Sequence, residues 1–330
     1  MARAVVILGA GASAPFGVPT LASLFKEPHA RRHLAADALL RDGLQNVFWG
    51  LRGCNLESSH LTVTVEDILT ILRDYDIHTP TIPSPLGADR DAFRRSLYVL
   101  IKKAVFDDKH SRGAHLNSFI KYMRETFEAT TWTSFNWDCI FESSFYYSSG
   151  NPMPPGDRYN PHLVIPVRNW KDGHTSQTYL KLHGGINWWF EDGAVTYLPF
   201  GGTTDLNDRW AAYAQGKARG HPVILEPSCY KYQDPVFNLL EPQWDRFVQD
   251  LIAADLVCII GYSLPESDAR ARMALTIGFQ SGKAAARWVV VNPNEEVCRR
   301  YARIFGTANV KTLSIGLEEF SHDIAGNLAP

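Results

Sequence analysis

A glycine turn directly follows an apolar run near the start of the chain. Ala4–Leu8 is continuous and β-prone, and it leads into Gly9-Ala10-Gly11-Ala12-Ser13. Glycines placed between a strand and a helix let the backbone approach a pyrophosphate, whose charge the N–H groups of the helix N-terminus neutralise. We expect that helix to begin near Ser13, a favoured cap residue. Such turns also serve only to reverse the chain, so both readings stay open.

The partner that a dehydrogenase needs is missing from its usual place. In hydride-transferring Rossmann enzymes an acidic residue about 20 positions further on, at the end of a second strand, binds the ribose. Glu27 is near that spacing, but it lies beside Pro28 with no strand before it. An ordinary dehydrogenase therefore fits poorly.

Further segments carry polar residues at or after apolar runs. They are Thr133-Ser134-Phe135-Asn136-Trp137-Asp138, Lys181-Leu182-His183-Gly184, Gly261-Tyr262-Ser263-Leu264 and Val291-Asn292-Pro293. Together with the glycine turn and Gly17-Val18-Pro19, and in this order, they resemble the motifs of the sirtuin-like family. The resemblance spans residues 9–293 and rests on the joint order of short segments.

The resemblance implies NAD as the ligand and a catalytic group of His183, Asn136 and Asp138. His183 would be the base, Asn136 would hold the nicotinamide ribose and Asp138 the carboxamide. The glycine turn would cradle the diphosphate, and residues after two later strands would line the adenosine half. The NAD-binding residues implied in this way are Gly9, Ala10, Gly11, Ala12, Ser13, Gly17, Pro19, Thr133, Asn136, Asp138, Gly261, Ser263 and Asn292.

These residue types suit the cleavage of an N-glycosidic bond. The ribose becomes oxocarbenium-like in the transition state, so the site must polarise sugar hydroxyls. Histidine is the natural proton acceptor near neutral pH.

The chain departs from the protein deacylases of the family in its cysteines. Those enzymes carry a four-cysteine zinc module after the catalytic histidine, whereas the five cysteines here are scattered and form no CxxC pair: Cys54, Cys139, Cys229, Cys258 and Cys298. We therefore expect reduced core cysteines and no metal site. In addition, Thr20-Leu21-Ala22 stands where deacylases have Asp-Phe-Arg, which removes an arginine expected near the cofactor.

The segment Ser263–Asp268 resembles the bacterial sirtuin-like proteins of anti-phage defence, which hydrolyse NAD. This implies an NAD+ hydrolase that releases nicotinamide and ADP-ribose, forms a homo-oligomer and acts with a partner protein encoded nearby. One rival is an NAD-dependent deacylase, against which the missing zinc module counts. The other is a non-catalytic sensor or scaffold for NAD or ADP-ribose, which would need no base.

Each of these residues also has an ordinary structural reading. His183 could be a strand-end histidine bonded to a backbone carbonyl, and Asn136 with Asp138 could be a helix cap with its first-turn acid. Trp188, Trp189 and Phe190 could form a lid, although hairpin aromatics more often pack in the core, which we favour. Asp268 and Glu266 either contact the adenosine ribose or begin the next helix. We expect the pairs Arg94-Arg95 and Arg299-Arg300 to lie on solvated helix faces.

Strand-like and helical runs alternate in a way that predicts an α/β fold with a Rossmann-like parallel sheet. After Ala4–Leu8, strand-like runs cover residues 129–135, 178–182, 222–225, 256–261 and 288–292. Between the first and second of these the texture is helical, with Thr64 and Asp67 as a capping box. Residues 188–197 read as a hairpin. We expect a discontinuous NAD-binding domain, 1–27 plus 115–330, and a helical insertion subdomain, 28–114.

Composition sets wider limits on function. The chain has 330 residues, 45% of them hydrophobic, and a formal net charge of -2, which gives no support for nucleic-acid binding. The apolar run from Ala4 to Ala10 is too short to span a membrane. We expect a cytoplasmic protein.

Overall fold

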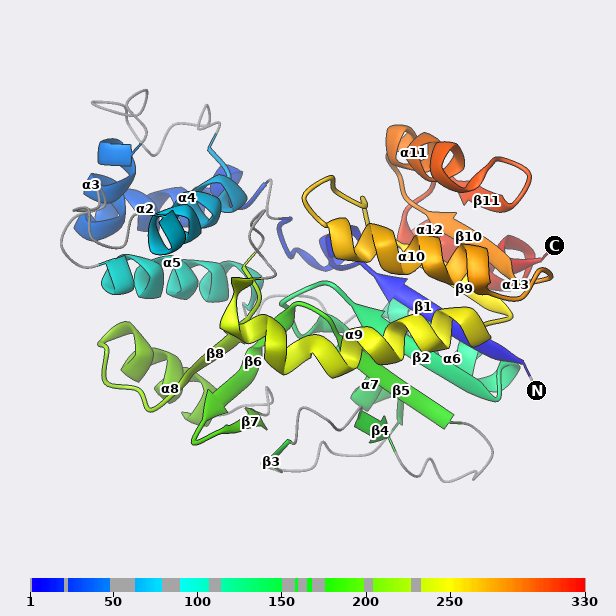
Figure 1. Ribbon diagram of the computed structural model, residues 1–330, viewed down its shortest axis with the longest axis horizontal. Coiled ribbons are helices and arrows are strands. Elements are labelled where there is room, and N and C mark those ends of the chain that lie inside the picture. The colour runs from blue at the N-terminus through cyan, green and yellow to red at the C-terminus, as the bar shows by residue number, and fades with distance from the viewer. Residues whose placement is uncertain are drawn as a thin grey trace.

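A mostly parallel sheet forms the centre of the molecule (Figure 1). The computed structural model describes residues 2–20, 23–47, 63–78, 90–106, 114–149, 158–159, 165–167, 176–198, 204–226 and 233–329. Over these residues the strand order is β11-β10-β9-β1-β2-β5-β4. The strands are β1 (Arg3–Leu8), β2 (Ala129–Ser134), β4 (Ile165–Val167), β5 (Ser176–Lys181), β9 (Leu256–Ile260), β10 (Arg287–Val291) and β11 (Val310–Leu313). Every pairing is parallel except β4 with β5, so the fold is α/β and Rossmann-like, as predicted.

Helices cover both faces of this sheet, which explains why its strands are continuous apolar runs. Alternate residues of β1 point to opposite sides: Val5 and Ile7 belong to one core cluster, and Val6 and Leu8 to another. The first cluster is completed by α9 (Pro235–Ala253), α10 (Ala269–Ser281) and α11 (Glu295–Phe305). The second is completed by α6 (Ala114–Thr126), α7 (Ile140–Ser149), α12 (Leu317–His322) and α13 (Ile324–Leu328).

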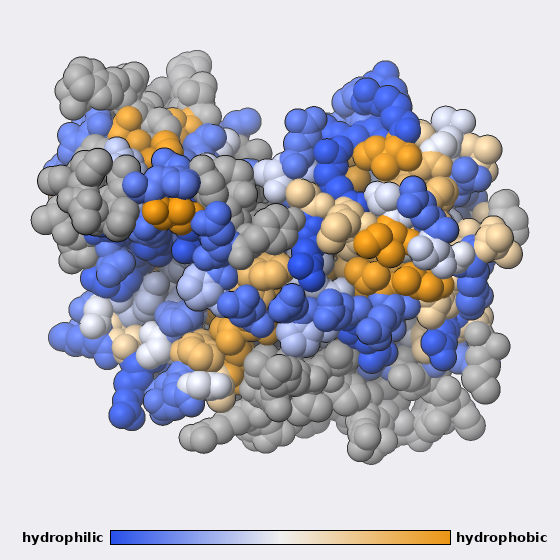
Figure 2. All heavy atoms as spheres, viewed as in Figure 1, coloured by the Kyte–Doolittle hydropathy of each residue, from blue (hydrophilic) through white to orange (hydrophobic). Residues whose placement is uncertain are grey.

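A second, antiparallel sheet packs with the remaining helices to form a part that we call the helical lobe. Its strands are β3 (Arg158–Tyr159), β6 (Gly184–Glu191), β7 (Ala194–Tyr197) and β8 (His221–Ile224). Its helices are α2 (Pro28–Ala36), α3 (Ala38–Val47), α4 (Val65–His78), α5 (Arg90–Val105) and α8 (Thr204–Ala214). They share one core cluster with Ile186, Trp189 and Ile224 of this sheet. The parallel strands run toward the lobe (Figure 1), and the space-filling view is hollowed between the two parts at its upper edge (Figure 2).

The local sequence signals are partly confirmed. Thr64 and Asp67 form the expected capping box, in which each backbone N–H donates to the other side chain. Trp188–Tyr197 is the expected hairpin, with Asp192 and Gly193 in left-handed turn positions. Trp188 and Trp189 are buried, as the core interpretation predicted.

Two predictions about the elements are wrong. The first helix, α1 (Ala10–Ser13), begins three residues before the predicted start, because it follows the strand directly from Gly9 and a 3₁₀ turn continues it over Ala14–Phe16. Residues 222–225, predicted for the parallel sheet, instead contribute to β8, which pairs antiparallel with β6. An apolar run indicates a strand in either kind of sheet, so it could not show which sheet these residues would join. The predicted boundaries of the insertion at 28 and 114 stay a prediction, although the helices of this region share their core with β6, β8 and α8.

The described part of the chain contains no helix that is both long and apolar enough to span a membrane. On the face seen in Figure 2, apolar atoms gather over α10 and α11. Met273 of α10 and Ile304 of α11 are large apolar side chains that are exposed.

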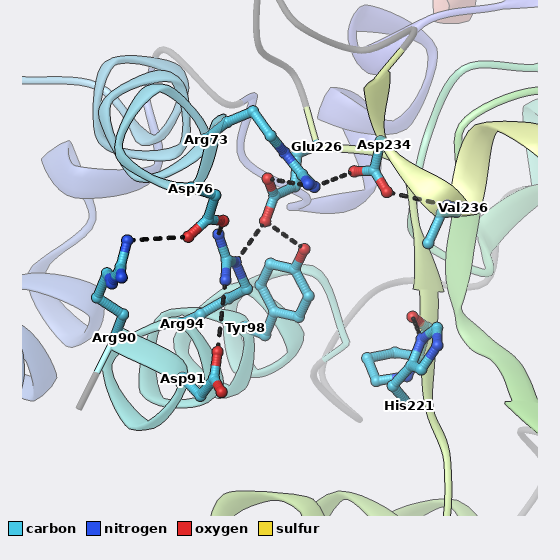
Figure 3. Close-up of polar contacts among 11 residues, drawn as sticks. Arg73, Asp76, Arg90, Asp91, Arg94, Tyr98, His221, Glu226, Asp234 and Val236 are labelled. Atoms are coloured by element: carbon cyan, nitrogen blue, oxygen red, sulfur yellow. Dashed lines mark hydrogen bonds and ion pairs between the residues drawn. The ribbon is translucent and has the colours of Figure 1, made fainter. Parts of the chain in front are cut away.

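A network of buried charges joins the helical lobe to the start of α9 (Figure 3). Glu226, which follows β8, faces Arg94 of α5 at 2.8 Å and Arg73 of α4 at 3.1 Å. Arg73 also lies 2.6 Å from Asp234, whose side chain caps α9 by accepting from the backbone of Val236. The acids are almost fully buried, so they need these partners, because an unpaired buried charge is costly. The network therefore ties two helices of the lobe to the β8–α9 connection.

The prediction that Arg94 lies on a solvated helix face is wrong. Its side chain is 17% exposed and contacts both Glu226 and Asp76. Burial alone would lower the pKa of Arg94, but the nearby carboxylates raise it well above its usual value, so the residue stays charged. Arg95 is half-buried, whereas Arg299 is exposed as predicted. The helical period could not show that an acid 132 positions later would come to face Arg94.

We predict that Arg94→Met lowers the free energy of unfolding by about 3 kcal/mol, because it leaves Glu226 with one fewer partner in a buried site. Arg299→Met is the matched control and should change stability by less than about 0.5 kcal/mol, since its ion pairs are solvated. Urea unfolding followed by circular dichroism measures both. Equal effects of the two substitutions would show that the network contributes no more than a surface pair.

Candidate functional site

Residues predicted to bind NAD or to act in catalysis follow β1, β2, β5, β9 and β10, which all run in the same direction. Their carboxyl ends therefore meet at one edge of the sheet. From β1 the chain proceeds to β2 on one side, whereas β9 and β10 lie on the other. β1 and β9 thus flank the topological switch point, where open α/β sheets bind ligands.

The glycine turn after β1 packs backbone to backbone against the turn after β9. The N–H of Gly9 donates to the carbonyl of Ile260, and the N–H of Gly11 donates to that of Gly261, both at 2.9 Å. A Cβ at Gly9 would lie 2.4 Å from Cα of Tyr262, and a Cβ at Gly11 would lie 2.9 Å from Cα of Gly261. The glycines therefore allow two adjacent turns to touch, and their N–H groups are engaged within the protein.

Asn136 connects the end of β2 to this glycine turn. Its Nδ2 donates to the carbonyl of Gly9 at 2.9 Å and to Oγ of Ser13 at 3.0 Å. Its own N–H donates to Oγ of Ser134. These bonds fix the side-chain amide of a buried residue at the edge where the strands converge.

Asp138 caps the start of α7, a role that Asn136 does not have. Its Oδ1 accepts from the N–H of Ile140 at 2.9 Å, at the start of α7. The predicted helix-cap interpretation thus describes Asp138 rather than Asn136.

A buried lysine holds the turn that carries these two residues. Lys181, the last residue of β5, donates from Nζ to the backbone carbonyl of Asp138 and to the carboxylate of Glu142. Burial alone would lower the pKa of Lys181, but the Glu142 carboxylate outweighs it and the pKa is raised. The ion pair therefore joins the end of β5 to the β2–α7 turn and to the start of α7.

His183 follows β5 and is buried among aromatic rings. Its ring lies edge-on to Phe135, with 5.0 Å between centroids, and tilted to Trp244 of α9 at 6.3 Å. Its Nε2 lies 3.3 Å from Oδ2 of Asp268. The predicted base is thus placed in an apolar pocket of side chains against a carboxylate.

The remaining predicted residues are spread along the same edge. Ser263 is exposed and its carbonyl accepts from Arg300. Asn292 is buried, and its Oδ1 accepts from the N–H of Asn294. Gly17 ends the 3₁₀ turn after α1 and Pro19 is half-buried two residues later. Thr133, by contrast, lies inside β2, fully buried beside Ile7 of β1.

Two residues that the sequence did not assign complete the surroundings of His183. Asp268 is the N-cap residue of α10, and Tyr262 follows β9; the tyrosine O–H donates to Oδ2 of Asp268 at 2.6 Å. Burial and the nearby Asp268 raise the pKa of Tyr262 well above its usual value, so it remains a donor. The sequence signal was the segment 263–268, for which the role of Asp268 was left open.

Solved structures with a similar fold include Sir2 proteins. A structure of a Sir2 enzyme matches with a TM-score of 0.52 and 13% identity, over 98% of this chain and 92% of that one. A Sir2 protein bound to a propionylated peptide gives 0.52 and 14%, over 99% and 94%. A complex of Sir2 with a peptide and NAD+ gives 0.51 and 13%, over 99% and 94%. The chain has a sirtuin-like fold. No family model matches the sequence, and no curated protein matches it.

Within this sirtuin-like fold, the histidines, cysteines and acids of the described residues form no group of three or more that could hold a metal ion. Cys139, Cys258 and Cys298 are buried thiols. Burial raises the pKa of both Cys139 and Cys258 well above the usual range. Cys54 and Cys229 lie outside the described residues.

The contact between the two turns predicts that a side chain at Gly261 greatly lowers the stability of the folded protein. This residue has φ +64, and a Cβ there would lie 2.2 Å from the backbone nitrogen of Ala12. Gly193 is the matched control, because it also has a positive φ but has nothing within 4 Å of its Cβ position. Gly193→Ala should cost only the left-handed strain of about 1–2 kcal/mol, and Gly261→Ala considerably more. Thermal unfolding measures both, and equal losses would show that the turns can separate cheaply.

Proposed function

We propose that this protein binds NAD+ at the carboxyl edge of its parallel sheet and hydrolyses the nicotinamide N-glycosidic bond, releasing nicotinamide and ADP-ribose. The observation that carries the proposal is the convergence of His183 and Asn136 at the switch point of a sirtuin-like fold. Both are buried polar side chains at an edge where such sheets bind nucleotides. One of the Sir2 structures with a similar fold is a complex with a peptide and NAD+.

The polar groups at this edge fit a nucleotide with two riboses. They include amides, an imidazole and hydroxyls, which exchange hydrogen bonds with sugar hydroxyls. The glycine turn fits less directly, because the N–H groups of Gly9 and Gly11 already donate to backbone carbonyls. The N–H of Ala12 likewise donates to the carbonyl of Gly9, so in this proposal the turn supplies close backbone approach rather than these N–H groups.

The mechanism assigns proton transfer to His183 and orientation to Asn136. His183 accepts a proton from a ribose hydroxyl as positive charge builds on the sugar and nicotinamide leaves. Water then adds at the carbon that nicotinamide leaves, its proton restores the ribose hydroxyl, and the proton on His183 passes to solvent. Asn136 holds the same ribose, since two hydrogen bonds fix its amide. Asp138 is proposed to contact the nicotinamide carboxamide, with its other role at the start of α7 retained.

The wider role proposed is that of an NAD-depleting effector in bacterial anti-phage defence, acting as a homo-oligomer with a partner protein encoded nearby. The resemblance of residues 263–268 to defence-associated proteins motivates this role. Expression of the active chain with that partner should lower cellular NAD+ after phage infection, and the His183→Ala chain should not. Unchanged NAD+ in infected cells would contradict the effector role and leave the chemistry to be judged in vitro.

We predict that His183→Ala lowers NAD+ turnover by about 10²–10⁴-fold, because it removes the general base. Asn136→Ala should cause a comparable loss, and the double variant should be scarcely worse if both act on one ribose. His322→Ala, an exposed histidine on α12, is the control and should leave turnover unchanged. Liquid chromatography of nicotinamide and ADP-ribose measures the rates, and calorimetry measures NAD+ affinity.

The same assay separates the rival functions. Nicotinamide release that requires an acyl-lysine peptide would identify a deacylase. NAD+ binding without release, alone and with the products of neighbouring genes, would identify a sensor. A fully active His183→Ala protein would remove His183 from the reaction.

A further inference from the structure

His183, the predicted base, and three side chains around it form a closed set of contacts. Phe135 stacks on Tyr262 with 4.2 Å between ring centroids and also meets the edge of His183. Tyr262 donates to Asp268, and Asp268 faces His183. These residues come from the ends of three strands and the start of α10, so the set joins the segments that make the site.

Asp268 is a buried acid that does not serve the helix it begins. It is the N-cap residue of α10, a position where aspartate normally accepts from the backbone of the first turn. Asp234 of α9 and Asn294 of α11 do so, at 2.9 Å in each case. Asp268 makes no such bond, and its Oδ2 lies against Tyr262 and His183 instead. Its carboxylate is thus directed at the base.

Because Asp268 is buried, the partners of its carboxylate matter for the free energy of the site. Asp268 is 1% exposed, and a buried carboxylate is costly unless it is hydrogen-bonded and paired with positive charge. The tyrosine supplies a neutral hydrogen bond. A protonated imidazole at 3.3 Å would supply the positive charge.

We infer that Asp268 is a positioning residue for His183: its carboxylate orients the imidazole and stabilises its protonated form. The inference rests on the proposed function. When His183 takes the proton of a ribose hydroxyl, the ring becomes an imidazolium beside the Asp268 carboxylate, and the proton later leaves to solvent. Asp268 touches no substrate in this scheme and keeps its charge throughout.

Other charged and titratable groups around the pair come from α9, α10, α11 and the end of β9. Arg270 lies over the rings of Phe237 and Trp244 and faces Asp245 at 3.8 Å. Tyr301 donates to the carbonyl of Tyr262, and the positive charge of Arg272 opposes the rise in the pKa of Tyr262. All of them remain when Asp268 is replaced, so a change in pH dependence would report the carboxylate itself.

The test compares Asp268→Asn with Asp245→Asn, the same change at an exposed position of α9. Asp268→Asn should lower kcat by about 10–100-fold, part of what loss of a general base costs, with KM for NAD+ little changed. The acid limb of the pH–kcat/KM profile should move to lower pH, because the protonated ring loses its counter-charge. Asp245→Asn should change neither, and a shared profile for wild type and Asp268→Asn would overturn the inference.

Tyr262→Phe covers the case in which Asp268→Asn does not fold. It removes only the hydroxyl, so the carboxylate loses a competing donor and attracts the imidazolium more strongly. The acid limb should then move to higher pH, the opposite direction. A purely structural role for the contacts would lower stability in both variants and leave both limbs in place.

An activity-free measurement separates this inference from the proposed function. NMR titration of ¹³C-labelled histidine, with the His183 signal assigned by its loss in His183→Asn, gives the protonation midpoint directly. The midpoint should be lower in Asp268→Asn than in wild type by about one pH unit. If wild type fails to hydrolyse NAD+ but this shift is seen, the proposed function fails and the pairing stands. An unchanged midpoint refutes the pairing whether or not the protein is active.

Discussion

The contact between the turns after β1 and β9 is the constraint on which the site depends. Gly9 and Gly11 approach Gly261 so closely that a side chain at any of the three would meet backbone atoms. Because β1 and β9 are adjacent and parallel, this contact brings the first residues of the chain against residues 250 positions later. Asn136 then binds the glycine turn from the β2 side. These contacts thus fix the ends of β1, β2 and β9 relative to one another.

Buried ion pairs add further constraints, one near His183 and one further away from it. Lys181 fixes the β2–α7 turn, which carries Asn136 and Asp138, by binding Glu142 and the carbonyl of Asp138. Further away, Arg73 and Arg94 hold Glu226 and Asp234 at the border of the helical lobe. Each ion pair joins elements that are distant in sequence. Breaking one partner would leave an uncompensated buried charge, which makes these connections cooperative.

The sequence predicted the features that depend on local pattern. Parallel strands, the Asp-Gly hairpin and the capping box follow from apolar periodicity and turn chemistry, and they are where expected. Contacts set by packing over long separations were not predictable: β8 pairs with the second sheet, and Arg94 faces Glu226. The motifs singled out Asn136 and His183, which follow β2 and β5 at one edge of the sheet, but they could not show that Asp268 faces His183. That fact depends on how α10 meets the end of β5, which no periodicity encodes.

The helical lobe and His183, the proposed base, are connected through α9. Arg73 of the lobe is paired with Asp234, and Asp234 caps the first turn of α9. Two turns further along, Gln243 accepts from the backbone N–H of Lys181, and Trp244 packs near His183. A displacement of the lobe that separates Arg73 from Asp234 would leave the N-cap carboxylate of α9 without its charged partner. It would also disturb the packing of Trp244, in the middle of the same helix, near His183. The described contacts thus connect Arg73 of the lobe to the surroundings of His183, with α9 between them.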